Sequence, residues 1–96
     1  MADFRLTQQA KADLDDIAVY TLENWGVQQA LRYVDSLEQC CHLLANRPNV
    51  GATASDLAPD LRRHAHRAHV VYYLPEKNGV LIVRMLHERM DAPRHM

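Results

Sequence analysis

Apolar residues in the first part of the chain recur at helical spacing. Three of them share one helical face: Ala10, Leu14 and Ile17. Thr7 precedes them as a candidate N-cap, whose side chain accepts a hydrogen bond from the first helical turn. Gly26 follows in "NWG" and can adopt the backbone conformation that ends helices. The pattern therefore predicts a helix over about residues 8–24.

A second helical stripe begins directly after the glycine. Its apolar members recur at intervals of seven, four and three positions: Ala30, Leu37, Cys41 and Leu44. Asn46 and Pro48 end it, because a proline biases the preceding residue away from helical geometry. Two helices joined by so short a break predict an antiparallel helical hairpin over about residues 8–46. Part of its apolar surface remains uncovered and requires a sheet.

The spacing changes from helical to alternating near residue 61. Three strands are predicted there, by "LRRHAH" (61–66), "AHVVYYL" (68–74) and "GVLIVRMLH" (79–87). A short strand, "DFRLT", is predicted near the N-terminus. Asn78-Gly79 favours a hairpin between the last two strands. Val80 to Leu86 is apolar at nearly every position, which is typical of a central strand with both faces covered.

These elements predict an α+β fold in the order β-α-α-β-β-β. An N-terminal strand is followed by an antiparallel helical hairpin, which packs on an antiparallel sheet. Residues 47–60 contain two prolines and small polar residues, so they are predicted to form a loop. The 96 residues suffice for one small domain but not for two. We therefore expect residues 1–96 to form a single domain.

The sequence favours a cytoplasmic protein. No apolar run approaches the roughly 20 residues that a membrane span requires. The N-terminal residues lack the basic region and apolar core of a secretory signal. Cys40 and Cys41 are adjacent, which does not suit a disulfide framework. We expect them in the second helix, with at least one buried as a small apolar side chain.

Charge is unevenly distributed along the chain, although the net charge is only −1. Residues 1–60 hold four bases and nine acids, a balance of −5. Residues 61–96 hold seven bases and three acids, a balance of +4, and five of the six histidines. This asymmetry indicates either a basic face that binds an acidic partner or two halves that neutralise each other in the fold.

The stretch "RRHAHRAH" (62–69) concentrates arginine and histidine. His64, His66 and His69 have a spacing that can bind zinc. Neighbouring arginines would repel a cation, and no carboxylate or cysteine lies among the histidines. We therefore expect no metal site. No glycine-rich phosphate loop is present either, so no nucleotide cofactor is expected.

A metal-independent ribonuclease is the catalytic alternative. Such an enzyme requires a general base, a general acid and cations that hold the phosphate, and histidine suits both proton-transfer roles near neutral pH. The residues that could supply these groups from one sheet are Arg62, Arg63, His64, His66, Arg67, His69, Arg84, His87 and Arg89. The competing interpretation is a basic surface that complements an acidic partner.

Several segments, in this order and spacing, resemble the ParE branch of the RelE/ParE superfamily of bacterial type II toxins. They are "AKADLDDIAVYTLENWG", "QALRYVDSL", "LANRPNVG", "LRRH", "HVVYYL" and "VLIVRMLHERMD". The resemblance covers about residues 6–96. It implies a toxin, without cofactor or metal, that inhibits DNA gyrase by binding it. It also implies no membrane association and no sequence-specific nucleic-acid contact.

The resemblance further implies a ParD-like antitoxin as partner. An antitoxin of this kind is an acidic, partly disordered chain that folds as it covers apolar surface on the toxin. The basic second half of the chain would attract it.

RelE-type members of the superfamily instead cut messenger RNA at the ribosome, using lysine and arginine on the sheet and often a C-terminal tyrosine. Here Lys77 falls in a predicted hairpin turn, and no tyrosine follows Tyr73. These departures favour a binding inhibitor over an enzyme. A ribosome-dependent ribonuclease remains the alternative, and a non-toxic protein-binding domain is the second. A glycine is also expected between the first two strands of the sheet, where this chain has Arg67-Ala68.

Target contacts are expected from the last strand and the tail, at Arg84, His87 and Arg89. Arginine suits such a surface because its planar guanidinium pairs with carboxylates through two hydrogen bonds. A second candidate group comprises Arg62, Arg63 and Arg67. The structural alternative is that Arg84 pairs with an acid of the helices and that His87 fixes the tail by hydrogen bonding.

Overall fold

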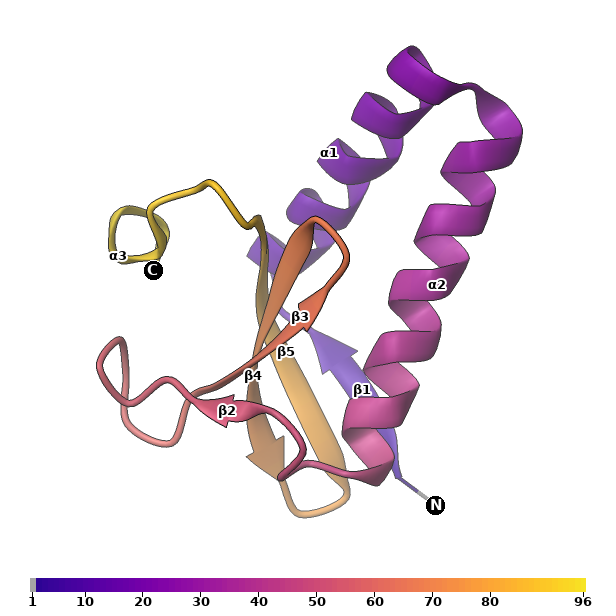
Figure 1. Cartoon of the computed structure of the whole chain (residues 1–96). Helices are drawn as coiled ribbons and strands as arrows, with labels where there is room; N and C mark the ends of the chain where they lie inside the picture. Colours follow the sequence, from indigo (N-terminus) through magenta and orange to yellow (C-terminus); the bar gives the residue numbers. More distant parts are fainter. Residues whose placement is uncertain (1) are drawn as a thin grey trace.

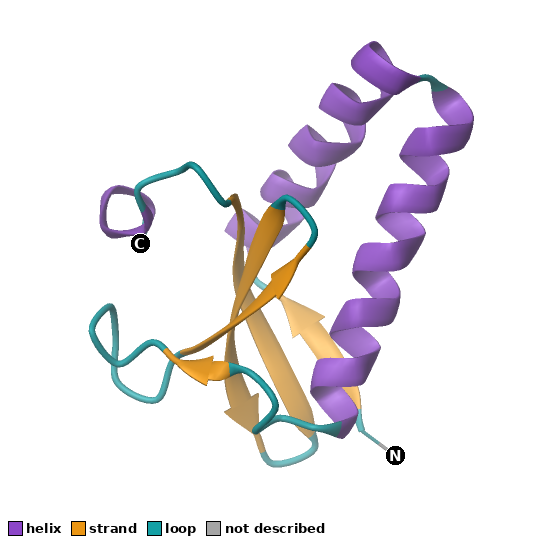
Figure 2. Cartoon of the chain, viewed as in Figure 1, coloured by secondary structure: helices purple, strands orange, loops and turns teal. Residues whose placement is uncertain are grey.

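The computed structural model describes residues 2–96 as a five-stranded sheet with a helical hairpin on one face (Figures 1 and 2). The elements are β1 (Asp3–Leu6), α1 (Gln8–Trp25), α2 (Val27–Asn46), β2 (Ala52–Thr53), β3 (Arg62–His66), β4 (His69–Glu76), β5 (Gly79–His87) and α3 (Ala92–His95). The predicted α+β class, the helical hairpin and the three strands after residue 61 are confirmed. Two short elements, β2 and α3, were not predicted.

The signals at both ends of α1 act as the sequence indicated. Thr7 is the N-cap, and its Oγ1 accepts a hydrogen bond from the backbone N–H of Ala10 at 3.0 Å. Gly26 separates the two helices with a φ of +89°. Its N–H donates to the carbonyl of Leu22, which satisfies one of the last backbone acceptors of α1.

The strand order in the sheet is β1-β5-β4-β3-β2. Strands β2 to β5 pair antiparallel, whereas β1 lies parallel to β5, with Phe4 opposite Val80. The predicted antiparallel sheet is therefore confirmed, with one parallel strand added at its edge. Parallel neighbours need a long crossover, and here all the elements between β1 and β5 supply it. The position of β5 between β1 and β4 confirms that it is a central strand.

The main core lies between the helical hairpin and the sheet. Its fully buried members include Leu37, Cys41 and Leu44 from α2, Val71 and Tyr73 from β4, and Val80 and Ile82 from β5. Both cysteines are free and buried, whereas the sequence predicted that at least one of them would be buried. Burial raises the pKa of Cys41 to about 12, so its thiol stays protonated at neutral pH.

A second, smaller core covers the opposite face of the sheet. Its buried members are Ala54, Leu61, Tyr72 and Leu86. The segment that the sequence predicted to be a plain loop contributes Ala54, together with the partly buried Leu57 and Ala58. An irregular segment therefore covers this face of the sheet, where α/β folds place a second layer of helices.

A β-bulge in β5 changes which of its residues face each core. Tyr72 pairs with Arg84 and Tyr73 pairs with Ile82, so Val83 is an extra residue in β5. Before the bulge Ile82 faces the helices, and after it Met85 does so, three positions further along. Strict alternation would have turned Met85 away from the helices.

The turn between β3 and β4 forms without the expected glycine. His66 pairs with His69, so Arg67 and Ala68 make the turn, and Arg67 adopts a φ of +53°. This left-handed conformation costs a residue with a Cβ roughly 1–2 kcal/mol.

Replacing Arg67 with glycine is expected to stabilise the protein by a few tenths to about 1 kcal/mol. Glycine removes the left-handed strain, while its greater flexibility in the unfolded chain offsets part of the gain. Urea denaturation measures the difference. Ala68→Gly is the matched control, because Ala68 has no positive φ and its replacement should be neutral or destabilising. A less stable Arg67→Gly protein would contradict the prediction.

Candidate functional site

A groove of about 680 Å³ separates α1 from the end of the sheet. One wall is the C-terminal half of α1, and the other is formed by the β3–β4 turn, the end of β5 and the residues after it. In Figure 1 the upper ends of α1 and α2 extend beyond the tip of the β3–β4 hairpin. The residues that line the groove are Asp13, Asp16, Ile17, Tyr20, Thr21, Trp25, Gln29, Tyr33, Ala68, His69, Met85, His87, Arg89 and Met90.

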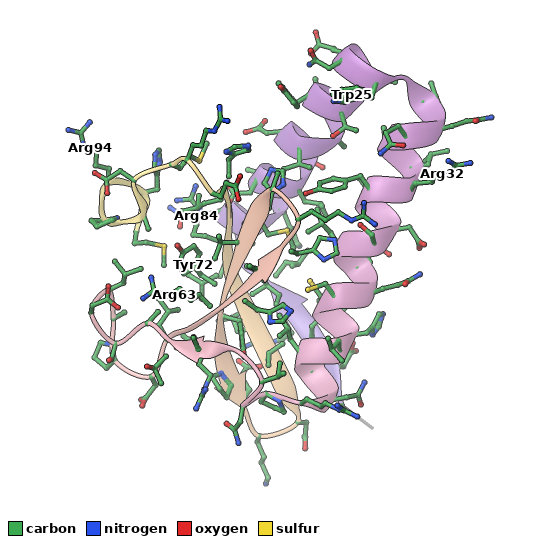
Figure 3. All side chains as sticks on the ribbon, in the orientation of Figure 1. Trp25, Arg32, Arg63, Tyr72, Arg84 and Arg94 are labelled. Carbon is green, nitrogen blue, oxygen red and sulfur yellow. The ribbon has the colours of Figure 1, made fainter. Side chains whose placement is uncertain are left out.

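Large apolar side chains in this groove remain open to solvent. Tyr20 is 64% exposed, Trp25 is 71% exposed and Met90 is 48% exposed. Trp25 occupies the last position of α1, near the end of the hairpin (Figure 3). Exposed aromatic and apolar side chains that gather in one concave region mark an interaction site more often than they mark ordinary surface.

Histidines form the sheet-side wall of the groove. His69 on β4 and His87 on β5 are direct cross-strand partners, and their rings meet edge to face at a centroid distance of 5.4 Å. The hydroxyl of Tyr33, on α2, lies 2.5 Å from Nδ1 of His69. One strand further along the sheet, Ser36 Oγ lies 2.9 Å from Nε2 of His66. These contacts fasten α2 to the tip of the β3–β4 hairpin.

The surroundings of His66 and His69 favour their neutral forms. Burial lowers the pKa of His69, and the neighbouring His87 and His66 lower it further, while Glu88 opposes them. Burial also lowers the pKa of His66, with further contributions from Arg67 and His64.

Stability is therefore expected to fall as the pH decreases below about 6.5, the usual histidine pKa. Below that pH the unfolded chain gains protons that the folded state still excludes, so protonation favours unfolding until the lowered pKa values are passed. Unfolding in urea at pH 7.5 and 5.5 tests this. A His66→Gln, His69→Gln protein should lose less stability over this interval than the parent, whereas a control substitution of the exposed His95, His95→Gln, should lose as much.

Arg84 is held in a largely buried ion pair with Asp13 of α1. Its Nε and Nη2 donate to the two carboxylate oxygens at 2.8 and 2.9 Å, and the side chains are only 15% and 12% exposed. Arg84 also donates to the backbone carbonyl of His95 in α3. The hydrogen bond to Asp13 raises the pKa of Arg84. Arg84 thus joins β5 to α1 and α3, which is the structural alternative considered from the sequence.

The carboxylate of Asp13 also accepts a hydrogen bond from the unpaired edge of β5. Strand β1 ends at Leu6, so beyond Ile82 the backbone of β5 has no neighbouring strand on that side. Thr7 Oγ1 donates to the carbonyl of Val83 at 2.8 Å, and Asp13 accepts from the N–H of Met85 at 2.9 Å. Side chains from the start of α1 therefore supply hydrogen-bond partners for backbone groups of β5 that have no neighbouring strand.

The other candidate residues fall into two places. His87 and Arg89 lie at the groove, where Nδ1 of His87 accepts from the backbone N–H of Arg89 at 3.1 Å. Arg62 donates to the carbonyl of Gly51 at 2.6 Å. Arg63 lies 3.4 Å from Asp56 on the side of the sheet away from the helices (Figure 3). The structure therefore does not bring Arg62 or Arg63 to the groove.

The remaining candidate, Arg67, is exposed in the β3–β4 turn and does not line the groove. The sequence did not single out Tyr33 or Met90 as site residues, and it gave Tyr20 and Trp25 only as positions of the family resemblance. The sequence did contain a signal for Tyr20 as a site residue. Tyr20 lies off the apolar stripe of α1, so the core does not cover this large aromatic side chain.

The described residues were also compared with the requirements of a metal site and of a membrane-spanning helix. Among residues 2–96, no three histidine, cysteine, aspartate or glutamate side chains come close enough together to hold a metal ion. Within the same residues, no helix combines the length and apolar character of a membrane span.

Comparison with known proteins gives the family. The family described as "ParE toxin of type II toxin-antitoxin system, parDE" matches residues 4–92. The chain is 40% identical over 98 residues to "Toxin ParE1" of Caulobacter vibrioides, covering 100% of this chain and 99% of the relative. It is also 40% identical over 92 residues to "Toxin ParE" of Escherichia coli, covering 95% of this chain and 89% of the relative.

A solved structure shows the same fold. A chain of the "Chromosomal ParDE TA system from P. aeruginosa" matches with a TM-score of 0.76 at 22% identity, covering 91% of this chain and 96% of that one. A small α+β toxin fold with an open apolar groove thus coincides with a family match over nearly the whole chain. The chain belongs to the ParE toxin family of type II toxin–antitoxin systems, which confirms the resemblance stated from the sequence.

Proposed function

We propose that this chain arrests bacterial growth by binding DNA gyrase and that a ParD-like antitoxin neutralises it by occupying the groove. Family membership supports the toxin role, because ParE toxins belong to parDE systems. The observation that carries the antitoxin part is the groove itself, in which Tyr20, Trp25 and Met90 remain exposed.

The groove suits an amphipathic helical segment of the antitoxin. Its apolar wall runs along the C-terminal half of α1, and helix-in-groove recognition places one apolar face of a helix against such a wall. The polar opposite wall would fix the orientation of that helix.

The gyrase contacts are proposed to lie beside the same groove, at His87 and Arg89. Arg89 is exposed and makes no ion pair among residues 2–96, so its guanidinium is available to a partner. Arg84 positions this region through Asp13. An antitoxin that fills the groove would cover Arg89, which explains neutralisation by steric exclusion. Arg62, Arg63 and Arg67 form the second candidate group.

Two assays in parallel test the target. Purified protein is added to a gyrase supercoiling reaction and to a translating-ribosome cleavage reaction. Gyrase inhibition without cleavage of messenger RNA supports the proposal. Cleavage without gyrase inhibition supports the ribonuclease alternative. No effect in either assay, combined with normal growth on expression, supports a non-toxic protein-binding domain. Co-expression with the product of the adjacent small gene tests the antitoxin, which should restore growth and yield a complex.

Arg89→Ala is expected to weaken growth arrest while leaving the fold intact. Arginine is enriched among the interface residues whose truncation costs more than about 1 kcal/mol, and a loss of about 1–3 kcal/mol corresponds to roughly 5- to 150-fold in affinity. Growth after induction and gyrase inhibition measure the effect. Arg94→Ala is the matched control, because Arg94 is another exposed arginine of the tail that lies outside the groove. Full toxicity of Arg89→Ala would direct attention to Arg62, Arg63 and Arg67.

A further inference from the structure

The two histidines of the groove are not equivalent, and the difference points to a role in recognition. We propose that the sheet-side wall of the groove is a binding site for a carboxylate of the antitoxin, and that His69 takes up a proton when this carboxylate arrives. The inference rests on the proposed docking of an antitoxin in the groove.

The hydrogen bond to His87 fixes which of its nitrogens carries hydrogen. A backbone N–H can only donate, so Nδ1 of His87, which receives the N–H of Arg89, carries no proton. Neutral His87 therefore has its hydrogen on Nε2 and presents a donor there. A second proton on His87 would have to occupy Nδ1 and would break the bond from Arg89.

His69 can accept a second proton without losing its partner. Its Nδ1 lies 2.5 Å from the hydroxyl of Tyr33, and a hydroxyl both donates and accepts. In the neutral tautomer that leaves Nδ1 without hydrogen, Tyr33 donates to Nδ1, and when His69 is protonated, Nδ1 donates to Tyr33. The contact survives in both states, so a second proton on His69 costs it no hydrogen bond.

The charges around His69 set the direction of the effect. The titratable groups near it are His66 from β3, His87 from β5, Glu88 after β5 and Tyr33 from α2. The charged residues Asp13, Asp16 and Arg89 line the same groove. The charge of Asp13 is already offset by Arg84. Burial and the adjacent imidazoles lower the pKa of His69, so the free protein holds it neutral at pH 7. A carboxylate placed against it reverses this balance.

The groove favours one carboxylate on an amphipathic segment over a nucleic acid. Arg89 and the two imidazoles supply donors for one anionic group, while Tyr20 and Trp25 offer apolar surface beside them. Asp16 in the groove and the exposed Glu88 would repel a second and a third negative charge, as in a phosphate backbone. An acidic side chain with apolar neighbours one helical turn away fits both walls.

Calorimetry of the complex tests the proton. The antitoxin that co-purifies with this chain is titrated into the toxin at pH 6.5 in two buffers of different ionisation enthalpy. The difference in measured heat gives the protons taken up, which we expect to be a positive fraction of one per toxin. Affinity should rise as the pH is lowered from 8 to 6, by up to about tenfold for each unit by which the pKa of His69 increases on binding.

Variants assign the proton to its residue. His69→Gln should abolish proton uptake and flatten the pH dependence of binding. His64→Gln is the matched control, because His64 is on the same hairpin but does not line the groove, and it should leave uptake unchanged. Should His69→Gln fail to fold, NMR titration of His69 in the parent protein decides the question, since its pKa must be higher in the complex than in the free toxin.

The outcomes separate this inference from the proposed function. Tight binding with no uptake, with proton release, or with uptake that persists in folded His69→Gln overturns the inference and leaves antitoxin docking in place. Absence of any complex overturns both. Proton uptake on adding an oligoribonucleotide instead of the antitoxin would overturn the carboxylate assignment in favour of a phosphate.

Discussion

Replacing Asp13 with alanine is expected to lower the free energy of unfolding by about 3–5 kcal/mol, the usual cost of removing one partner of a buried ion pair. The change would leave the guanidinium of Arg84, which is only 15% exposed, without its carboxylate. It would also remove the acceptor for the N–H of Met85 at the open edge of β5. Urea denaturation at pH 7.5 measures the loss.

Two further substitutions of α1 separate these contributions. Asp15→Ala is the matched control, because Asp15 is exposed on the same helix and its loss should be close to neutral. Asp13→Asn retains an oxygen that can accept from Met85, so it should fall between the parent and Asp13→Ala. A parent-like stability of Asp13→Ala would show that solvent replaces the carboxylate and that the ion pair contributes little.

Gly79→Ala is expected to destabilise the protein by a similar amount, about 3–5 kcal/mol, because it combines strain with a steric clash. Gly79 has a φ of +148°, and a Cβ there would overlap the carbonyl oxygen of Asp3 and lie 2.7 Å from its carbonyl carbon. Both atoms belong to the backbone of β1, so the clash can be relieved only by moving the strand.

Gly26→Ala is the control that isolates the clash. Gly26 also has a positive φ, +89°, but a Cβ there would meet nothing within 4 Å. Its φ of +89° and ψ of 172° lie in a backbone region that is essentially confined to glycine, so its replacement should cost only the backbone strain, about 1–3 kcal/mol. Equal losses for the two variants, again measured by urea denaturation, would show that the approach of β1 to Gly79 does not matter.

Short-range patterns were sufficient for the helices and for most of the strands. The spacing of Ala10, Leu14 and Ile17 reports the buried face of α1 directly, because a helix repeats every 3.6 residues whatever it packs against. Asn78-Gly79 likewise marked the β4–β5 hairpin, although Lys77 and Asn78 form the turn and Gly79 already belongs to β5.

Features that depend on distant residues were not readable in the sequence. An alternating pattern in residues 3–6 predicts a strand but carries no information on its direction, which is decided by the free edge of β5. The bulge at Val83 was hidden because β5 is apolar on both faces. Ala54, Leu57 and Ala58 read as a loop because they have no periodicity, yet they cover one face of the sheet.

The candidate site was predicted only in part, because it too depends on contacts between residues that are distant in the sequence. The sequence grouped Arg84, His87 and Arg89 because they lie within six positions. Arg84 instead turns to Asp13, a residue 71 positions earlier in the chain, whereas the other two line the groove. The role of these residues in toxicity stays a prediction. No local pattern identifies Tyr33 as the partner of His69, since that contact forms only when α2 meets the β3–β4 hairpin.

The parallel pairing of β1 with β5 makes the order of synthesis important. Strand β1 leaves the ribosome before the other four strands of the sheet, yet it pairs with β5, which leaves after them. Val80 and Ile82 of β5 also supply the core beneath the helices. At about 5–20 residues per second, the helical hairpin therefore waits several seconds with an incomplete core. His87 and Arg89 emerge later still, so the nascent toxin has no finished groove. A premature stop codon anywhere before β5 removes the central strand, and such alleles should be common among mutants selected to survive expression of this protein.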